Sequence, residues 1–134
     1  GYLEGMAHGL PVQFLGYIAD REHVQLLNAC DLIAIPSRNE PFGLVLTEAW
    51  SAERCVVATD VGGLSENIDN YINGIKVPVR PDSIAWGFCH LIDDPVYMQS
   101  LGKAGRRKVM EKFRWAVVTE RTLGVYRKVL SGGP

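Results

Sequence analysis

Cysteines are few in this sequence, and their placement excludes a disulfide framework. Cys30, Cys55 and Cys89 lie far apart and inside apolar stretches, which predicts buried, reduced thiols and a cytoplasmic protein. No apolar run approaches the roughly 20 residues that a membrane-spanning helix requires, and the first residues do not resemble a secretory signal. We therefore expect contact with a membrane to be peripheral at most.

A surplus of charge is also missing, as are the common metal and dinucleotide motifs. The 14 lysines and arginines against 15 aspartates and glutamates give a formal net charge of −1, which offers no global attraction for nucleic acid. His8, His23 and His90 have no metal-ligand spacing with cysteines or carboxylates, so no metal is predicted. The G-x-G-x-x-G fingerprint is absent, so NAD binding is not supported.

The composition is that of a globular domain. The 134 residues are 47% hydrophobic, enough for one domain with its own core. Short apolar runs alternate with amphipathic stretches, which predicts βα units and an α/β fold with a Rossmann-like parallel sheet. We expect strands at 12–15, 31–35, 55–58 and 74–77. We expect helices at 22–29, 44–52, 65–69, 81–92, 95–113 and 115–130.

One helix is expected to carry a local basic cluster. A solvated face is one interpretation, and a surface that touches an anionic acceptor or a membrane lipid is the other. The cluster consists of Lys103, Arg106, Arg107, Lys108, Lys112 and Arg114.

The most informative segment is 36–50, which follows the apolar run Asp31–Ile35. That run is typical of a buried parallel strand, and a turn rich in proline and glycine leads from it into a helix at Leu44. Glu40 therefore lies in the loop at the carboxyl end of a strand, and Glu48 lies in the second turn of the helix. Because helical side chains tilt toward the amino end, we expect both carboxylates to face one crevice. Ligands bind at this edge of open α/β sheets, and free N–H groups there suit a phosphate, so the pattern predicts a nucleotide site.

The run from Glu40 to Leu44, followed by Glu48, resembles the E-x7-E motif of retaining nucleotide-sugar glycosyltransferases of family 4. That family includes relatives of glycogen synthase and sucrose synthase and has the two-domain GT-B fold. The resemblance extends over roughly residues 12 to 130, through further segments in the family's order. These segments are 12–17, 29–37, 56–59, 62–66, 73–77 and 113–115.

The resemblance implies that this chain is the carboxyl-terminal, donor-binding domain of such an enzyme. Glu48 would bind the ribose, although a solvent-facing helix residue is the alternative. Glu40 would be the catalytic residue beside the donor sugar, although it would also suit the positive end of a helix dipole. The Phe42 side chain is a pocket wall or a packing residue. The residues implied in binding the sugar and phosphates are Asn39, Glu40, Pro41, Phe42, Gly43 and Leu44.

The same resemblance implies a base site directly after the first expected strand. Gly16, Tyr17 and Ile18 would hold the base, largely through main-chain groups. Tyr17 is otherwise a surface aromatic residue. We expect the backbone here to matter more than the side chains.

Three further residues are expected to line the cleft. The Thr47 hydroxyl reaches a phosphate in one interpretation and bonds back to the helix backbone in the other. Gly62 and Gly63 stand at a strand-to-helix turn, where a need for positive φ explains glycine equally well.

The implied reaction moves a hexosyl group from a nucleoside diphosphate sugar to a saccharide, lipid or other hydroxyl acceptor, without a cofactor. Two upstream strands, a basic pair facing the diphosphate and an amino-terminal acceptor domain are expected beyond this chain, which alone would be inactive. The segment 131–134 is expected to be a flexible tail. The alternatives are a nucleotide-sugar epimerase of the same fold and a non-catalytic nucleotide-sugar-binding module.

Overall fold

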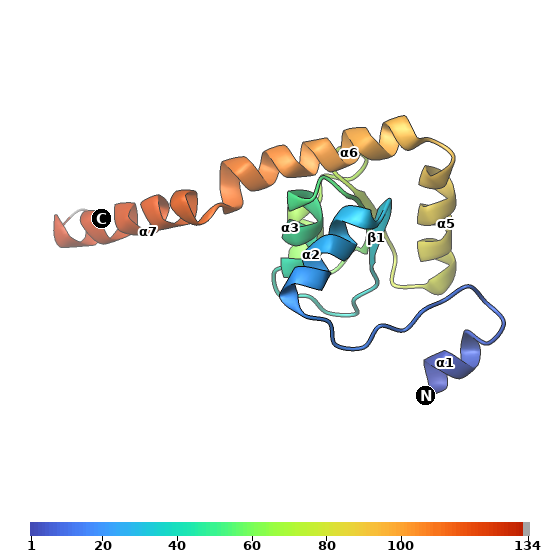
Figure 1. Cartoon of the computed structure of the whole chain (residues 1–134). Coiled ribbons are helices and arrows are strands. Elements are labelled where there is room, and N and C mark those ends of the chain that lie inside the picture. The colour runs from blue at the N-terminus through green and yellow to red at the C-terminus, as the bar shows by residue number, and fades with distance from the viewer. Residues whose placement is uncertain (133–134) are drawn as a thin grey trace.

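The computed structural model describes residues 1–132 and contains a parallel sheet in the order β1-β2-β3. The strands are β1 (Leu32–Ile35), β2 (Cys55–Thr59) and β3 (Ile75–Val77). The helices are α1 (Tyr2–Met6), α2 (Asp20–Ala29), α3 (Leu44–Ser51), α4 (Gly62–Asn67), α5 (Pro81–Ile92), α6 (Pro95–Lys108), the π-helix η1 (Val109–Phe113) and α7 (Trp115–Leu130). Figure 1 shows most of the helices packed around the sheet, with α1 set apart from it at the amino end and α7 extending away at the carboxyl end.

The central strand β2 explains why the sheet is covered on both faces. All its residues are buried, and its side chains alternate between two hydrophobic clusters. Val56 and Ala58 pack with residues of α3 and α4, whereas Cys55 and Val57 pack with residues of α5 and α6. A short apolar run with no polar alternation is therefore the sequence signature of this fully buried strand.

Trp50 is the largest fully buried side chain and joins three parts of the fold. Its ring belongs to α3, and its indole N–H donates to the carbonyl oxygen of Asn73 at 2.8 Å. Gly105 of α6 lies directly against the ring, so a side chain at that position would meet the indole atoms. The absence of a Cβ at Gly105 lets α6 approach α3 closely.

The expected strand at 12–15 is wrong. These residues are extended but exposed, and among residues 1–132 no strand pairs with them. Apolar content alone does not make a strand, because a strand needs a neighbour that satisfies its backbone groups. The other expected strands and helices are present, with α4 beginning three residues earlier than expected and 95–113 divided into α6 and η1.

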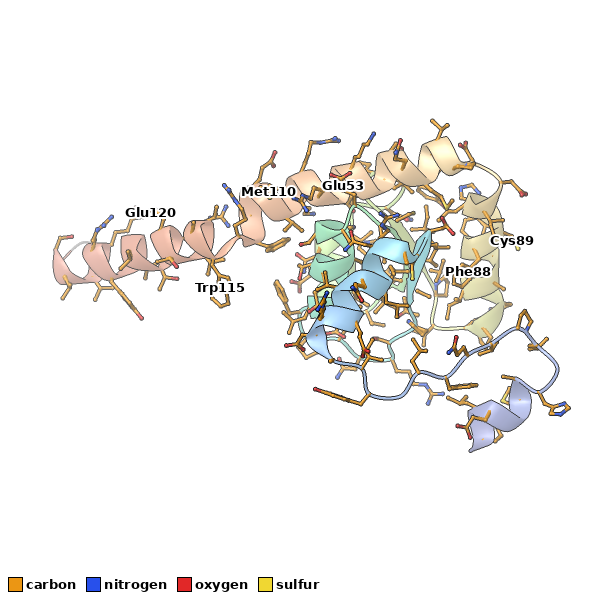
Figure 2. The ribbon with its side chains drawn as sticks, viewed as in Figure 1. Glu53, Phe88, Cys89, Met110, Trp115 and Glu120 are labelled. Carbon is orange, nitrogen blue, oxygen red and sulfur yellow. The ribbon has the colours of Figure 1, made fainter. Side chains whose placement is uncertain are left out.

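The three cysteines differ in their surroundings. Cys55 is buried in β2, and burial raises the pKa of its thiol to about 12, so the thiol stays protonated and unreactive at neutral pH. Cys30 is half-buried. The expectation of burial is wrong for Cys89, which is exposed on α5 and labelled in Figure 2, because it lies on the side of that helix that does not pack against the sheet.

The α7 helix has no buried residue, and Trp115 at its start is 84% exposed. Figure 2 shows its side chains projecting from an isolated helix. None of the helices within residues 1–132 is long and apolar enough to cross a membrane. Of the expected tail 131–134, the last two residues lie outside the described residues.

Three members of the basic cluster donate hydrogen bonds within the fold. Arg114 donates to the carbonyl oxygen of Met110 at 2.8 Å, and Arg106 donates to that of Ser51. The Lys108 side chain is 13% exposed, and its ammonium group donates to the Asn67 carbonyl oxygen at 2.6 Å and to the Asp69 carboxylate at 2.7 Å. The hydrogen bond from Lys108 is the main cause that lowers the pKa of Asp69. Arg106 and Lys108 therefore fasten α6 to α3 and to the segment after α4.

We expect Lys108→Met to lower the free energy of unfolding by about 1 to 2 kcal/mol, because a carbonyl and a carboxylate lose a charged donor. Water offsets part of this loss, since the Asp69 side chain is 55% exposed. A lowered pKa in the folded state contributes stability that is present above the unfolded pKa and lost as the pH falls through the folded pKa.

Urea unfolding of both proteins should therefore give a constant difference from about pH 5 to 8 that shrinks below about pH 4. Lys103→Met, on the exposed side of the same helix, is the matched control and should change little. A difference that persists unchanged at low pH would contradict the role of the Asp69 carboxylate.

Candidate functional site

The loop between β1 and α3, residues 36–43, carries most of the expected donor-binding residues and is called the donor loop below. It lies at the carboxyl edge of the sheet, and Gly43, with φ of 94°, is the N-cap of α3. The Gly43 N–H donates to the Glu40 carboxylate at 3.0 Å. The backbone N–H groups of the first turn of α3 open toward this edge and have no partners within the helix. The Glu40 carboxylate thus lies at the positive end of α3. This is the helix-dipole interpretation given for Glu40 in the sequence analysis.

Hydrogen bonds to backbone carbonyl groups fix the position of this loop. The Gly63 N–H donates to the carbonyl oxygen of Glu40 at 2.7 Å, and the Asn67 side-chain amide donates to the carbonyl oxygen of Phe42 at 3.1 Å. The Thr59 hydroxyl, at the end of β2, donates to the carbonyl oxygen of Ser37. The neighbouring strand and α4 therefore hold the loop, in addition to the bond within it between Gly43 and Glu40.

Gly62 and Gly63 pack against this loop from α4. A Cβ at Gly62 would meet the backbone of Glu40, and a Cβ at Gly63 would meet the backbone of Phe42. Gly62 also has φ of 43°, as the turn interpretation required. Both glycines are explained by close backbone approach, and their contact with a ligand stays a prediction.

Glu48 lines a groove of about 240 Å³ between α2 and α3. Glu40 is not among the residues that line it. That the two carboxylates face one ligand crevice stays a prediction. The other lining residues are His23, Val24, Leu27, Asn28, Ser51 and Ala52.

His23 and Asn28 are polar residues of this groove that sequence reasoning missed. The lining positions of α2 repeat at 23, 24, 27 and 28, the spacing of one helix face. That spacing was readable in the sequence, but which neighbouring helix the face would meet was not. His23 was interpreted as a surface or half-buried residue and is half-buried.

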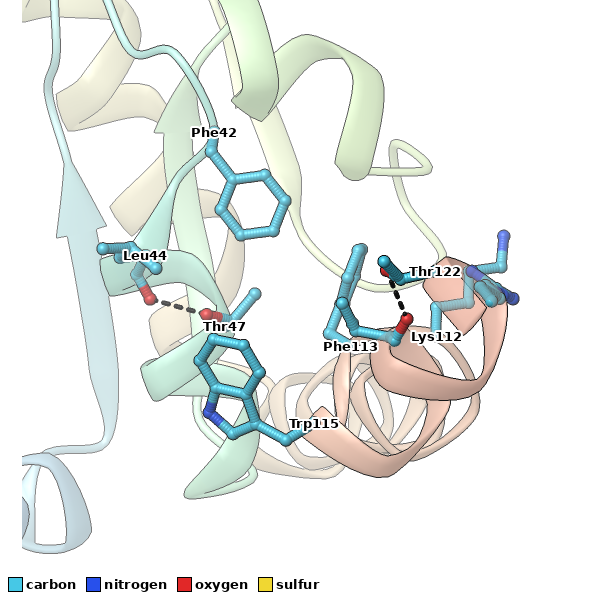
Figure 3. A pocket seen from close by; sticks show the side chains of 9 residues that line it. Phe42, Leu44, Thr47, Lys112, Phe113, Trp115 and Thr122 are labelled. Carbon is cyan, nitrogen blue, oxygen red and sulfur yellow. Dashed lines mark hydrogen bonds between the residues drawn. The ribbon is translucent and has the colours of Figure 1, made fainter. Parts of the chain in front are cut away.

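A larger cavity of about 530 Å³ lies on the other side of the donor loop, between α3 and the start of α7 (Figure 3). The Thr47 hydroxyl donates to the carbonyl oxygen of Leu44 at 2.8 Å, which is the backbone-bonding interpretation. Phe42 lines the cavity and also packs edge-on against Phe113, with ring centroids 5.6 Å apart. The cavity is lined by Phe42, Leu44, Thr47, Lys112, Phe113, Trp115, Val118, Arg121 and Thr122.

The expected base segment precedes α2, and the Tyr17 side chain in it is 95% exposed. Gly16 has φ of 63°, and Ile18 is half-buried. Asn39 and Pro41 are exposed in the donor loop. Within residues 1–132, no group of three or more His, Cys, Asp or Glu side chains is arranged to hold a metal ion.

Comparison with known proteins places this geometry in a family. Residues 3–108 match the family described as glycosyl transferases group 1. An uncharacterized glycosyltransferase of Methanocaldococcus jannaschii is 37% identical over 131 residues, which cover 94% of this chain and 34% of that protein.

Solved structures of glycosyltransferases are also similar to this chain. Sucrose-phosphate synthase of Thermosynechococcus elongatus aligns with a TM-score of 0.87 and 29% identity over 98% of this chain and 34% of its own. Anabaena HepE in complex with UDP-glucose aligns with a TM-score of 0.84 and 26% identity over 95% of this chain and 36% of its own.

This chain spans about a third of the length of these proteins. Its structural neighbours are GT-B glycosyltransferases, which confirms the expected fold class of a parallel sheet flanked by helices. The alignments with these glycosyltransferases include β1, the loop that ends at Gly43, and α3. The chain belongs to the group 1 glycosyltransferases.

Proposed function

We propose that this chain is the donor-binding domain of a retaining glycosyltransferase that moves a hexosyl group from a nucleoside diphosphate sugar to a hydroxyl acceptor. One observation carries the proposal. A loop whose carbonyl groups accept hydrogen bonds from β2 and α4 leads to the amino end of α3 at the carboxyl edge of the sheet, where α/β proteins bind nucleotides. The family and the UDP-glucose-bound neighbour HepE support the choice of ligand.

Each part of the site has a task in this proposal. The backbone N–H groups of Phe42 and Leu44 would contact the diphosphate, which suits the positive end of α3. The Gly43 N–H holds the Glu40 carboxylate, and the missing side chain at Gly43 would let the diphosphate approach the loop closely. Glu48 would accept hydrogen bonds from the two ribose hydroxyls within the groove between α2 and α3. The base would lie beside Gly16 to Ile18, just before the amino end of α2.

Glu40 would act at the donor sugar while its hydrogen bond to Gly43 holds it in place. In the reaction, the bond from the anomeric carbon to the diphosphate breaks, and a bond from that carbon to the acceptor oxygen forms on the same face. The departing diphosphate oxygen takes the proton of the acceptor hydroxyl. The protein contributes position and charge stabilisation, which requires neither a metal nor a free nucleophile.

Ligand-detected NMR of this chain with UDP, ADP, GDP and their glucose conjugates tests the donor site. We expect one nucleotide to bind and Glu48→Gln to weaken it at least about tenfold, because hydrogen bonds to a charged group contribute about 1.5 to 3 kcal/mol. Glu120→Gln, on the exposed face of α7, is the matched control and should bind as the unsubstituted chain does. Unchanged binding in a folded Glu48→Gln variant, or no binding of any nucleotide, would contradict the proposal.

A further inference from the structure

Four aromatic side chains gather on the α5 side of the sheet, away from the donor loop. The ring of His90 stacks on Trp86, with centroids 4.9 Å apart and planes 12° from parallel. Tyr71 and Tyr97 meet His90 edge-on, at 6.1 and 6.3 Å. This aromatic cluster is not a core feature, because Trp86 is 48% exposed and Tyr71 is 50% exposed.

The backbone that carries Tyr71 is fixed by hydrogen bonds. Tyr71 has φ of 64°, a conformation that bulky residues seldom adopt. Its N–H donates to the carbonyl oxygen of Gly74 at 2.9 Å, and its carbonyl oxygen accepts from the Tyr97 hydroxyl at 3.1 Å. A fixed backbone lowers the conformational entropy that is lost when a ligand covers the ring.

The cluster borders a pocket of about 360 Å³ beside the edge strand β3. Polar groups join the rings there, as is typical of small-molecule sites. The charges in the pocket are already compensated. Asp82 pairs with Arg80, while Lys76 donates to the carbonyl oxygen of Ser65 at 2.9 Å and lies 3.6 Å from Asp60. The lining residues are Tyr71, Lys76, Val77, Pro78, Asp82, Ser83 and Trp86.

We propose that this aromatic cluster and its pocket form a second saccharide site, which binds a neutral oligosaccharide. The pyranose ring has a face of C–H bonds and an edge of hydroxyl groups. The negative face of an aromatic ring attracts the weakly positive C–H bonds, and Asp82 and Ser83 offer hydrogen-bond partners to the hydroxyls. A free phosphate is disfavoured, because the cations at this pocket already have partners.

The proposed site is distinct from the donor site. Its pocket shares no lining residue with the groove of Glu48 or with the cavity beside Phe42. The choice of saccharide as ligand rests on the proposed function, since a transferase that extends or modifies sugar chains meets them at high local concentration. Such a site would retain the acceptor or product chain on the enzyme without taking part in the transfer.

The indole N–H signals of the three tryptophans give a direct test on the unsubstituted chain. Trp50 is buried in the core, Trp115 is exposed on α7, and Trp86 alone belongs to the proposed site. The probes are maltoheptaose and an α-1,6-linked mannotetraose, up to about 10 mM, where even a Kd near 1 mM fills most of the site. We expect one probe to shift the Trp86 signal and leave the other two unchanged.

Variants refine the test. Trp86→Ala should weaken saccharide binding at least about tenfold, and Trp115→Ala, which removes an exposed indole elsewhere, should not. Tyr71→Asn removes the second ring and places a residue there that tolerates positive φ, so it should also weaken binding. If Trp86→Ala does not fold, the indole N–H shifts of the unsubstituted chain still show whether a saccharide binds at Trp86.

Two results would overturn the inference: no shift of Trp86 with either probe, or saccharide binding that Glu48→Gln removes as fully as Trp86→Ala does. The proposed function is judged separately by the nucleotide titration. If the chain binds UDP-glucose but neither saccharide, that result contradicts only the saccharide-site inference. If the chain binds a saccharide through Trp86 but binds no nucleotide, that result contradicts only the donor-site proposal.

Discussion

Gly105→Ala should destabilise the fold by about 3 kcal/mol, the upper range of overpacking costs. A Cβ at this position meets the ring of Trp50. The ring has no room to withdraw, because it is fully buried and its N–H is bonded to Asn73. Helix α6 must then move away from α3, and the contacts along both helices weaken together. Thermal or urea unfolding measures the loss, which corresponds to a fall in midpoint temperature of about 10 °C.

Gly124→Ala provides the matched control, because Gly124 is also inside a helix but has nothing within contact distance of a new Cβ. Alanine is a better helix former than glycine by about 1 kcal/mol, so this variant should be as stable as the unsubstituted chain or slightly more so. The two variants share the propensity gain and differ in packing. A Gly105→Ala protein as stable as Gly124→Ala would show that α6 does not pack tightly on Trp50.

Gly63→Ala should reduce nucleotide-sugar binding by about 100-fold, because a shifted loop loses a hydrogen bond to the charged diphosphate, and such bonds contribute about 1.5 to 3 kcal/mol. The new Cβ would meet the Phe42 backbone, and backbone atoms cannot rotate away as a side chain can. The loop must shift, and the hydrogen bond from the Gly63 N–H to the Glu40 carbonyl oxygen is lost or stretched. The amino end of α3 then no longer meets the diphosphate in its original position.

Titration with the nucleotide sugar that binds the unsubstituted chain measures this effect, with circular dichroism to confirm that the variant is folded. Gly5→Ala, in α1 and with nothing near a new Cβ, should leave binding unchanged. Equal affinities of the Gly63→Ala and Gly5→Ala proteins would mean that the position of the loop does not determine donor binding.

The segment from β1 to α3 was predictable because its structure is decided locally. A β-branched apolar run, two prolines and a glycine specify a strand, a loop and a helix start without reference to the rest of the chain. The expected strand at 12–15 failed because strand formation depends on a partner that the sequence pattern does not reveal. Hydrophobic periodicity predicted the helices well, because each helix forms its backbone hydrogen bonds within its own segment.

The local positions of the candidate site residues could be predicted, but their surroundings could not. The positions of Glu40 and Glu48 relative to the helix followed from spacing, whereas the groove that Glu48 lines depends on how α2 packs against α3. The contact of Gly63 with the loop joins residues about 20 positions apart. The meeting of Trp86 and Tyr71 at His90 likewise depends on tertiary packing, so neither arrangement was visible in the sequence.

The strand order leaves β1 at one margin of the sheet, with no further strand beside it within residues 1–132. Unsatisfied backbone donors and acceptors on such a margin can recruit a strand from another molecule. The margin is only four residues long, and Pro36 directly after it cannot donate a hydrogen bond to extend the pairing. The margin at Leu32–Ile35 is therefore where we expect a further strand to pair with this sheet, and the proline limits that pairing to these four residues.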